Sequence, residues 1–199
     1  MTVSKDNFAS HIRQCEEAIE IYNYLKANGY SADFGLRFVW VAAVSALDKY
    51  ITELIIEKST HHFSNGMQFS GKILNEQVPI SSMMAMHSAP PPLAVIEFRK
   101  IITGAVRYRT FQKADDVADG LSFIWNEDHK WNKISENLGI ENKKAKRKLN
   151  SIGIRRDAIV HNADFDEVNN KLTECDLDQA SEAMSYIVKI VHIIDELVP

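Results

Sequence analysis

The chain has 199 residues, of which 45% are hydrophobic and 25% charged, and its formal net charge is −4. These values are ordinary for one globular domain with a sizeable core, and they give no overall basic balance that would mark a nucleic-acid-binding protein. The chain contains only 8 glycines and 5 prolines, which favours long helices over many short strands.

Two cysteines, Cys15 and Cys175, lie far apart in the chain and lack the spacing of a metal site. We therefore expect two free thiols and no disulfide framework. The N-terminal residues contain no apolar signal core, and the longest strongly apolar stretch, 38–47, is too short to span a bilayer. The sequence thus predicts a cytoplasmic protein that does not insert into a membrane.

Apolar residues at spacings of three and four predict a series of helices along the chain. In chain order, these predicted helices cover residues 5–28, 35–58, 93–111, 114–125, 131–138, 141–162 and 177–197. The second of them is apolar nearly all round in its first half, which is typical of a central helix packed on several sides.

The segment 59–92 has a weaker pattern, because Pro79 and the three prolines at 90–92 interrupt it. One or two short helices are expected there, near 71–76 and 80–87.

Residues 163–176 are polar and acidic and predict a loop. Within it, Asp164 and Glu167 have the spacing of a capping box that begins one helical turn. No strand and no internal repeat is predicted. We therefore expect an all-α protein, a bundle of six to eight helices that forms one domain over residues 1–199.

Positive charge is concentrated in residues 143–156, KKAKRKLNSIGIRR, which hold seven Lys and Arg and no acid. Subtracting this +7 from the net charge of −4 leaves −11 on the rest of the chain. The segment admits two interpretations, a solvated helix face or a surface that attracts polyanions. In the second case, the substrate-binding residues are Lys144, Arg147, Lys148 and Arg155.

The stretch RRDAIVHNAD, residues 155–164, begins at the end of this basic segment and combines arginine, acid and histidine near the end of the predicted helix 141–162. An arginine followed by a histidine at this spacing is a common chance pattern. On a regular helix Arg156 and His161 point about 140° apart, so they converge only if the helix bends or ends near them. In the alternative interpretation, the arginines lie at the rim of a helix and His161 contacts its last carbonyls.

RRDAIVHNAD also resembles the Rx4–6H signature of the HEPN superfamily, and it looks most like the RiboL-PSP-HEPN branch. Further segments are similar to this branch over about residues 30–197. They are RFVWVAAVSALDKYITELI at 37–55, TFQKADDVADGL at 110–121 and KW at 130–131.

The resemblance implies a compact helical bundle and, in many members, a metal-independent endoribonuclease of toxin–antitoxin, phage-defence or RNA-processing systems. It implies a homodimer in which two motifs face each other across a shared cleft. Arg156 and His161 would be the catalytic pair, with Asp157 at the polar position after the arginine. The expected partners are RNA, a second copy of the chain, and an antitoxin or other regulatory protein, and no metal or cofactor is expected.

One position departs from the pattern of HEPN toxins that are paired with nucleotidyltransferases. Those toxins often carry a modifiable tyrosine two residues after the histidine, where this chain has Ala163. Silencing by modification at that position is therefore not supported.

Two residues are expected to support the site from behind. Asp48 interrupts an apolar helix, and it either caps the core through hydrogen bonds or supports the catalytic residues from behind without contacting the substrate. Asn162 follows His161 directly. Two rival functions remain open, a non-catalytic HEPN-like module that binds RNA or a protein, and a plain structural helical domain.

Overall fold

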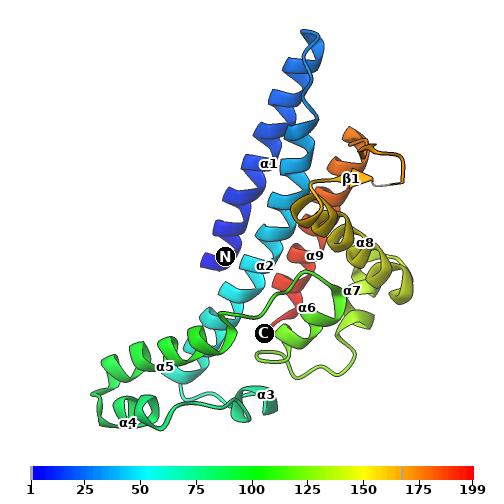
Figure 1. Ribbon diagram of the computed structural model, residues 1–199. Coiled ribbons are helices and arrows are strands. Elements are labelled where there is room, and N and C mark those ends of the chain that lie inside the picture. Colours follow the sequence, from blue (N-terminus) through cyan, green and yellow to red (C-terminus); the bar gives the residue numbers. More distant parts are fainter. Residues whose placement is uncertain (1, 167) are drawn as a thin grey trace.

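The computed structural model describes residues 2–166 and 168–199 and is almost entirely helical (Figure 1). Over these residues it contains nine helices and one short pair of antiparallel strands. The elements are α1 (Val3–Ala27), α2 (Asp33–Ser64), α3 (Gly71–Leu74), α4 (Ile80–Ser88), α5 (Pro91–Val106), α6 (Ala114–Leu121), α7 (Lys130–Leu138), α8 (Asn142–His161), β1 (Phe165–Asp166), β2 (Lys171–Leu172) and α9 (Leu177–Leu197). The predicted all-α class is confirmed. The helix count among the described residues exceeds six to eight, because both short helices of the 59–92 segment form.

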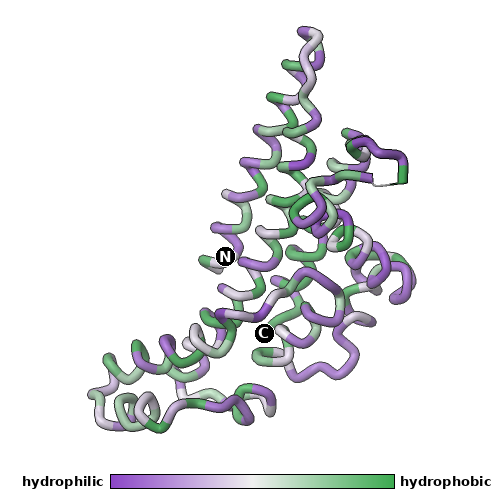
Figure 2. The backbone as a smooth tube through the Cα atoms, viewed as in Figure 1, coloured by the Kyte–Doolittle hydropathy of each residue, from purple (hydrophilic) through white to green (hydrophobic). Residues whose placement is uncertain are grey.

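The long helix α2 is the centre of the molecule. It contacts α1, α5, α6, α8 and α9, and its apolar residues from Leu36 to Ile55 are buried on several sides. Figure 2 shows hydrophobic residues along much of α2 and α9. Helix α1 runs antiparallel to α2, and the connected ends of the two helices project from the rest of the molecule (Figure 1). The central position that the apolar sequence predicts for this helix is therefore found.

Helices α3, α4 and α5 form a lobe around the C-terminal end of α2 (Figure 1). Pro79 and Pro90 occupy the N-cap positions of α4 and α5, where a residue that lacks a backbone N–H costs no helical hydrogen bond. The ring of Phe98 on α5 stacks on that of Phe63 on α2 at 4.3 Å and on that of Phe69 at 5.4 Å. These aromatic contacts attach the lobe to the central helix.

The predicted helix 93–111 ends early, at Val106, and residues 107–113 run on as a separate segment. The reason is tertiary: the backbone N–H of Phe111 donates to Asp48 Oδ1 at 2.8 Å, and the Phe111 ring is buried. Continuing the helix would remove both interactions. The predicted helix 114–125 likewise ends at Leu121, after which three-residue turns place Phe123 in the core.

The chain reverses after α8 in a way that the sequence did not predict. Ala163 and Asp164 have φ angles of 51° and 58°, in the left-handed region. The backbone N–H of Asp164 donates to the carbonyl of Ala158 at 3.1 Å, and β1 pairs with β2, with Phe165 opposite Leu172. The loop prediction was therefore incomplete, and the turn expected from Asp164 is not helical. Its other residue, Glu167, lies outside the described residues.

No helix of the described chain is both long enough and apolar enough to pass through a bilayer.

Candidate functional site

The motif occupies the last two turns of α8, which stays helical up to His161. The buried residues of this helix, among them Leu149 and Ile152, mark the face that packs on the core. Arg156 follows them by seven and four residues and so lies on the same face. His161 is exposed, and the regular helix directs it about 140° away from Arg156. Within one chain, the structure therefore does not bring the two side chains together.

Arg156 is held in place but makes few contacts. Its side chain is 19% exposed, and Nη1 donates to Asp157 Oδ1 at 3.1 Å. Its Nε atom is buried and has no hydrogen-bond partner among the described residues. A buried donor without an acceptor costs free energy, and such groups are rare outside functional sites and ordered-water sites. Because the bond to Asp157 is the one side-chain hydrogen bond of Arg156 within the described residues, its terminal nitrogens keep donors free for another acceptor.

The neighbouring Arg155 is in the opposite situation. Both of its terminal nitrogens donate to the carboxylate of Asp164, which is buried, and Nη2 also lies 3.4 Å from the carbonyl oxygen of Glu174. Sequence reasoning assigned Arg155 to substrate binding, but most of its donors are occupied within the protein. Its geometry favours a role in holding the chain that follows the motif.

Asp164 binds a second arginine that sequence reasoning missed. Arg37 on α2 donates through Nε to Asp164 Oδ2 at 2.7 Å and through Nη2 to the carbonyl oxygen of Thr173 at 2.8 Å. The two arginines and Asp164 therefore join α2, the end of α8 and the strand that follows. The sequence did contain a signal for Arg37, because it is a single cation directly before the apolar stretch 38–47. Like Asp48 directly after that stretch, a partly buried charge there needs a partner. This cluster fixes the helix end on which His161 and Asn162, both exposed, lie.

Asp157 faces the segment that precedes α6. Its Oδ2 lies 3.9 Å from Lys113 Nζ, in a half-exposed ion pair. One turn earlier, Gly153 packs so closely on this segment that a Cβ there would lie 3.2 Å from the carbonyl oxygen of Gln112. The absence of a side chain at 153 thus lets the motif helix contact residues 112–113 directly.

Asp48 acts on the same segment from the other side. Its two carboxylate oxygens accept the backbone N–H of Phe111 at 2.8 Å and Gln112 Nε2 at 2.9 Å. Asp48 therefore supports the segment that contacts α8 through hydrogen bonds. Within the described residues, its carboxylate makes no hydrogen bond to Arg156 or His161.

The basic strip at the start of α8 is partly neutralised, although the first turns of this helix are hydrophilic (Figure 2). Lys148 pairs with Glu182 and lies 4.8 Å from the centre of the Tyr186 ring. Lys144 lies 3.8 Å from Glu141 in an exposed pair. Arg147 is exposed and forms no ion pair within the described residues. Of the predicted phosphate contacts, Arg147 is thus the least engaged.

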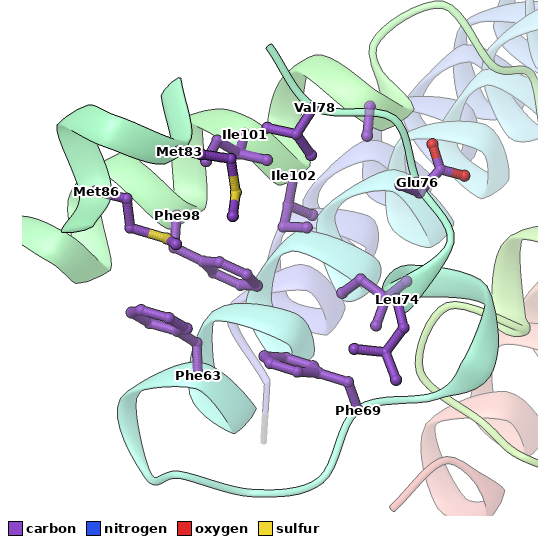
Figure 3. Close-up of a pocket in the computed structure, with 12 residues that line it drawn as sticks. Phe63, Phe69, Leu74, Glu76, Val78, Met83, Met86, Phe98, Ile101 and Ile102 are labelled. Carbon is purple, nitrogen blue, oxygen red and sulfur yellow. The ribbon is translucent and has the colours of Figure 1, made fainter. Parts of the chain in front are cut away.

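A separate cavity of about 400 Å³ lies in the lobe around the end of α2 (Figure 3). Its lining is mostly apolar, with Phe63, Phe98 and Met86 on one side and Glu76 near the opposite edge. It contains none of the motif residues. Over residues 2–166 and 168–199, no group of three or more His, Cys, Asp or Glu side chains is arranged to hold a metal ion.

Comparison with known proteins adds one finding. A family model described as RiboL-PSP-HEPN matches residues 10–198, which includes the motif on α8 and most of α1. No curated protein and no solved structure matches the chain. Because the family model covers almost the whole chain, and because the helical fold agrees with it, the chain belongs to the RiboL-PSP-HEPN family.

Proposed function

We propose that this protein is a metal-independent endoribonuclease whose site is completed by a second copy of the chain. Family membership supports the coarser statement, a nuclease or RNA-binding module of the HEPN type. The observation that carries the finer proposal is the unequal state of the two adjacent arginines. The terminal nitrogens of Arg155 make three hydrogen bonds, to Asp164 and Glu174, whereas those of Arg156 make one within the described residues, to Asp157. A phosphate group is the natural acceptor for such a partly buried guanidinium.

The chemistry uses the RNA's own hydroxyl group as the nucleophile. The 2′-oxygen attacks the adjacent phosphorus, the bond from phosphorus to the 5′-oxygen breaks, and the products are a 2′,3′-cyclic phosphate and a 5′-hydroxyl. One His161 takes the proton from the 2′-hydroxyl, and the partner subunit's His161 gives a proton to the leaving 5′-oxygen. Arg156 binds the phosphate oxygens and stabilises the charge that develops on them, and Asp157 orients Arg156.

A second copy explains why one chain leaves the pair apart. His161 is exposed, on a side of α8 that faces away from Arg156, so a twofold axis beside this helix can bring His161 of each chain toward Arg156 of the other. Large apolar side chains around the motif support such an interface. On α8, Ile154 is 62% exposed and Val160 45%, and the paired strand residues Phe165 and Leu172 are 42% and 55% exposed. The interface is proposed to bury these four side chains.

In the cell, we propose a defence or toxin-type effector, or an RNA-processing enzyme, that is restrained by an antitoxin or another regulatory protein. Expression of the wild-type chain alone should then slow growth, and expression of His161→Ala at the same level should not.

The test is an RNA cleavage assay in excess EDTA. Wild type is expected to cleave, while His161→Ala and Arg156→Ala are expected to lose at least 100-fold in rate, on the order of the contribution of a general acid–base or of charge stabilisation. Matched controls are His192→Ala and Arg13→Ala, since both side chains are exposed and distant in sequence from the motif. Equal cleavage by wild type and His161→Ala would refute the proposed site.

Subunit mixing tests the shared cleft. After exchange with a ninefold excess of His161→Ala subunits, only about one wild-type chain in ten has a wild-type partner, so activity per wild-type chain should fall about tenfold. The matched control adds Ile154→Asp to the His161→Ala chain. If Ile154 lies in the interface, this double variant should not reduce the activity of wild type. Unchanged activity in the first mixture would show that each chain carries an independent site.

The divergence of Arg156 and His161 within one chain also favours a second candidate, a non-catalytic module that binds RNA or a protein. RNA binding by a dimer without any cleavage would support this module over the enzyme.

A further inference from the structure

The loop 107–113, RYRTFQK, connects α5 to α6 and is anchored at alternate positions. Arg109 donates to Glu76 Oε1 at 2.8 Å, and its guanidinium lies 5.1 Å from the centre of the Phe123 ring. The Phe111 ring is buried against Gly120, where a Cβ would lie 2.6 Å from a ring carbon. With the hydrogen bonds that Phe111 and Gln112 donate to Asp48, these contacts make the loop a fixed part of the molecule.

The remaining residues of this loop point outward and carry charge and an aromatic ring. Arg107, Thr110 and Lys113 are exposed, and Tyr108 is 83% exposed. The guanidinium carbon of Arg107 lies 5.1 Å from the centre of the Tyr108 ring. From Arg107 to Lys113 the loop contains three cationic residues and no acid. An exposed aromatic ring beside a cation, carried by an anchored loop, is an arrangement that proteins use to stack a nucleobase and contact its phosphate.

The loop leads directly to the motif. Lys113 Nζ lies 3.9 Å from Asp157, and Gln112 packs on Gly153 of α8. Tyr108 and Lys113 are five positions apart in the chain, so their Cα atoms are at most about 18 Å apart. A single strand bound along the loop would therefore reach Arg156 within a few nucleotides.

We propose that this loop is the path by which single-stranded RNA enters the site, with one base stacked on Tyr108 and phosphates bound by Arg107 and Lys113. The proposal rests on the RNA-directed function proposed above. It assigns the entry path to the loop in preference to the start of α8, because residues 142–149 contain cations but no aromatic ring on which a base could stack. An unpaired strand is specified because the bases of a duplex have no free face to stack on Tyr108.

The test measures binding of a fluorescein-labelled, mixed-sequence single-stranded RNA 20-mer by anisotropy, in a His161→Ala background so that the probe stays intact. Tyr108→Ala is expected to raise Kd at least fivefold, as the loss of one base–aromatic stack predicts, and Tyr108→Phe should stay within twofold of the parent. Arg107→Ala is expected to raise Kd and to reduce its salt dependence. The matched control is Tyr24→Ala, since Tyr24 is 69% exposed on the projecting end of α1. Circular dichroism should show that each variant remains folded.

The outcomes separate this proposal from the enzyme proposal. If Tyr108→Ala weakens binding but wild type never cleaves RNA, the entry path is supported and the catalytic function fails. If wild type cleaves in a His161-dependent manner, the path alone is refuted when Tyr108→Ala leaves KM unchanged in the active chain and Kd unchanged in the His161→Ala background. Absence of RNA binding by the parent, or equal loss of duplex and single-strand binding in Tyr108→Ala, would also refute it.

Discussion

The buried carboxylate of Asp164 allows a sharp test of how the motif is held. Its side chain is 1% exposed and lies between the guanidinium groups of Arg37 and Arg155. Replacing it by asparagine removes the negative charge and keeps nearly the same shape. Asparagine also tolerates the φ of 58° at this position better than most residues, so backbone strain contributes little to the difference.

The expected loss follows from the surroundings of the two arginines. Removing one partner of a buried ion pair typically costs about 3–5 kcal/mol, because the remaining charge is left without compensation. Here the side chains of Arg37 and Arg155 are 19% and 21% exposed, so water can compensate part of their charge. The asparagine oxygen also still accepts one hydrogen bond. We therefore expect Asp164→Asn to lower the free energy of unfolding by about 3 kcal/mol, near the lower end of that range.

Urea unfolding followed by circular dichroism at neutral pH measures this loss. The matched control is Glu17→Gln, which removes one negative charge from an exposed position in α1 and should change stability by no more than about 0.5 kcal/mol. Because the cluster fixes the end of α8, the proposed cleavage activity should fall even under conditions where Asp164→Asn is fully folded. A loss of less than about 1 kcal/mol would refute the view that this carboxylate holds the two arginines together.

Three further outcomes are expected. The pKa of Asp195 lies below 3.8, because burial raises it but hydrogen bonds from Lys5 and Thr2 lower it more. Its contribution to stability is therefore present above pH 3.8 and is lost as the pH falls through the pKa of the folded state. Urea unfolding should show that Asp195→Asn is less stable than wild type at pH 7 and similar to it at strongly acidic pH. Gly120→Ala should cost about 1–3 kcal/mol in urea unfolding, since its methyl group would overlap the buried ring of Phe111; an unchanged stability would mean that the ring moves freely. Ile154→Asp should halve the mass measured by light scattering and abolish cleavage, whereas a dimeric variant would place the interface elsewhere.

The positions of most helices follow from the sequence because apolar spacing depends on local periodicity. The ends of helices are predicted less well, because they depend on distant residues. The helix predicted to run to residue 111 stops at Val106 since Asp48, 63 positions away, captures the N–H of Phe111. No local pattern encodes that choice.

The candidate site shows the same division. The motif and the exposure of His161 near a helix end could be anticipated from RRDAIVHNAD. The distinct states of Arg155 and Arg156 could not, because they depend on Asp164 folding back through two left-handed residues and on Arg37, 127 positions before it. The two adjacent arginines therefore have different hydrogen-bond partners, and these partners depend on the tertiary fold and not on the local sequence.

Arg37 and Asp48 both project from α2, so the central helix sets the spacing between the two chain segments that they bind. Arg37 binds Asp164, just after His161, and Asp48 binds Phe111 in the loop that carries Tyr108. Eleven residues of helix correspond to about 16 Å along its axis, and a helix hardly stretches. The distance between the chain segment after His161 and the loop 107–113 is therefore set by the number of residues between Arg37 and Asp48 in α2.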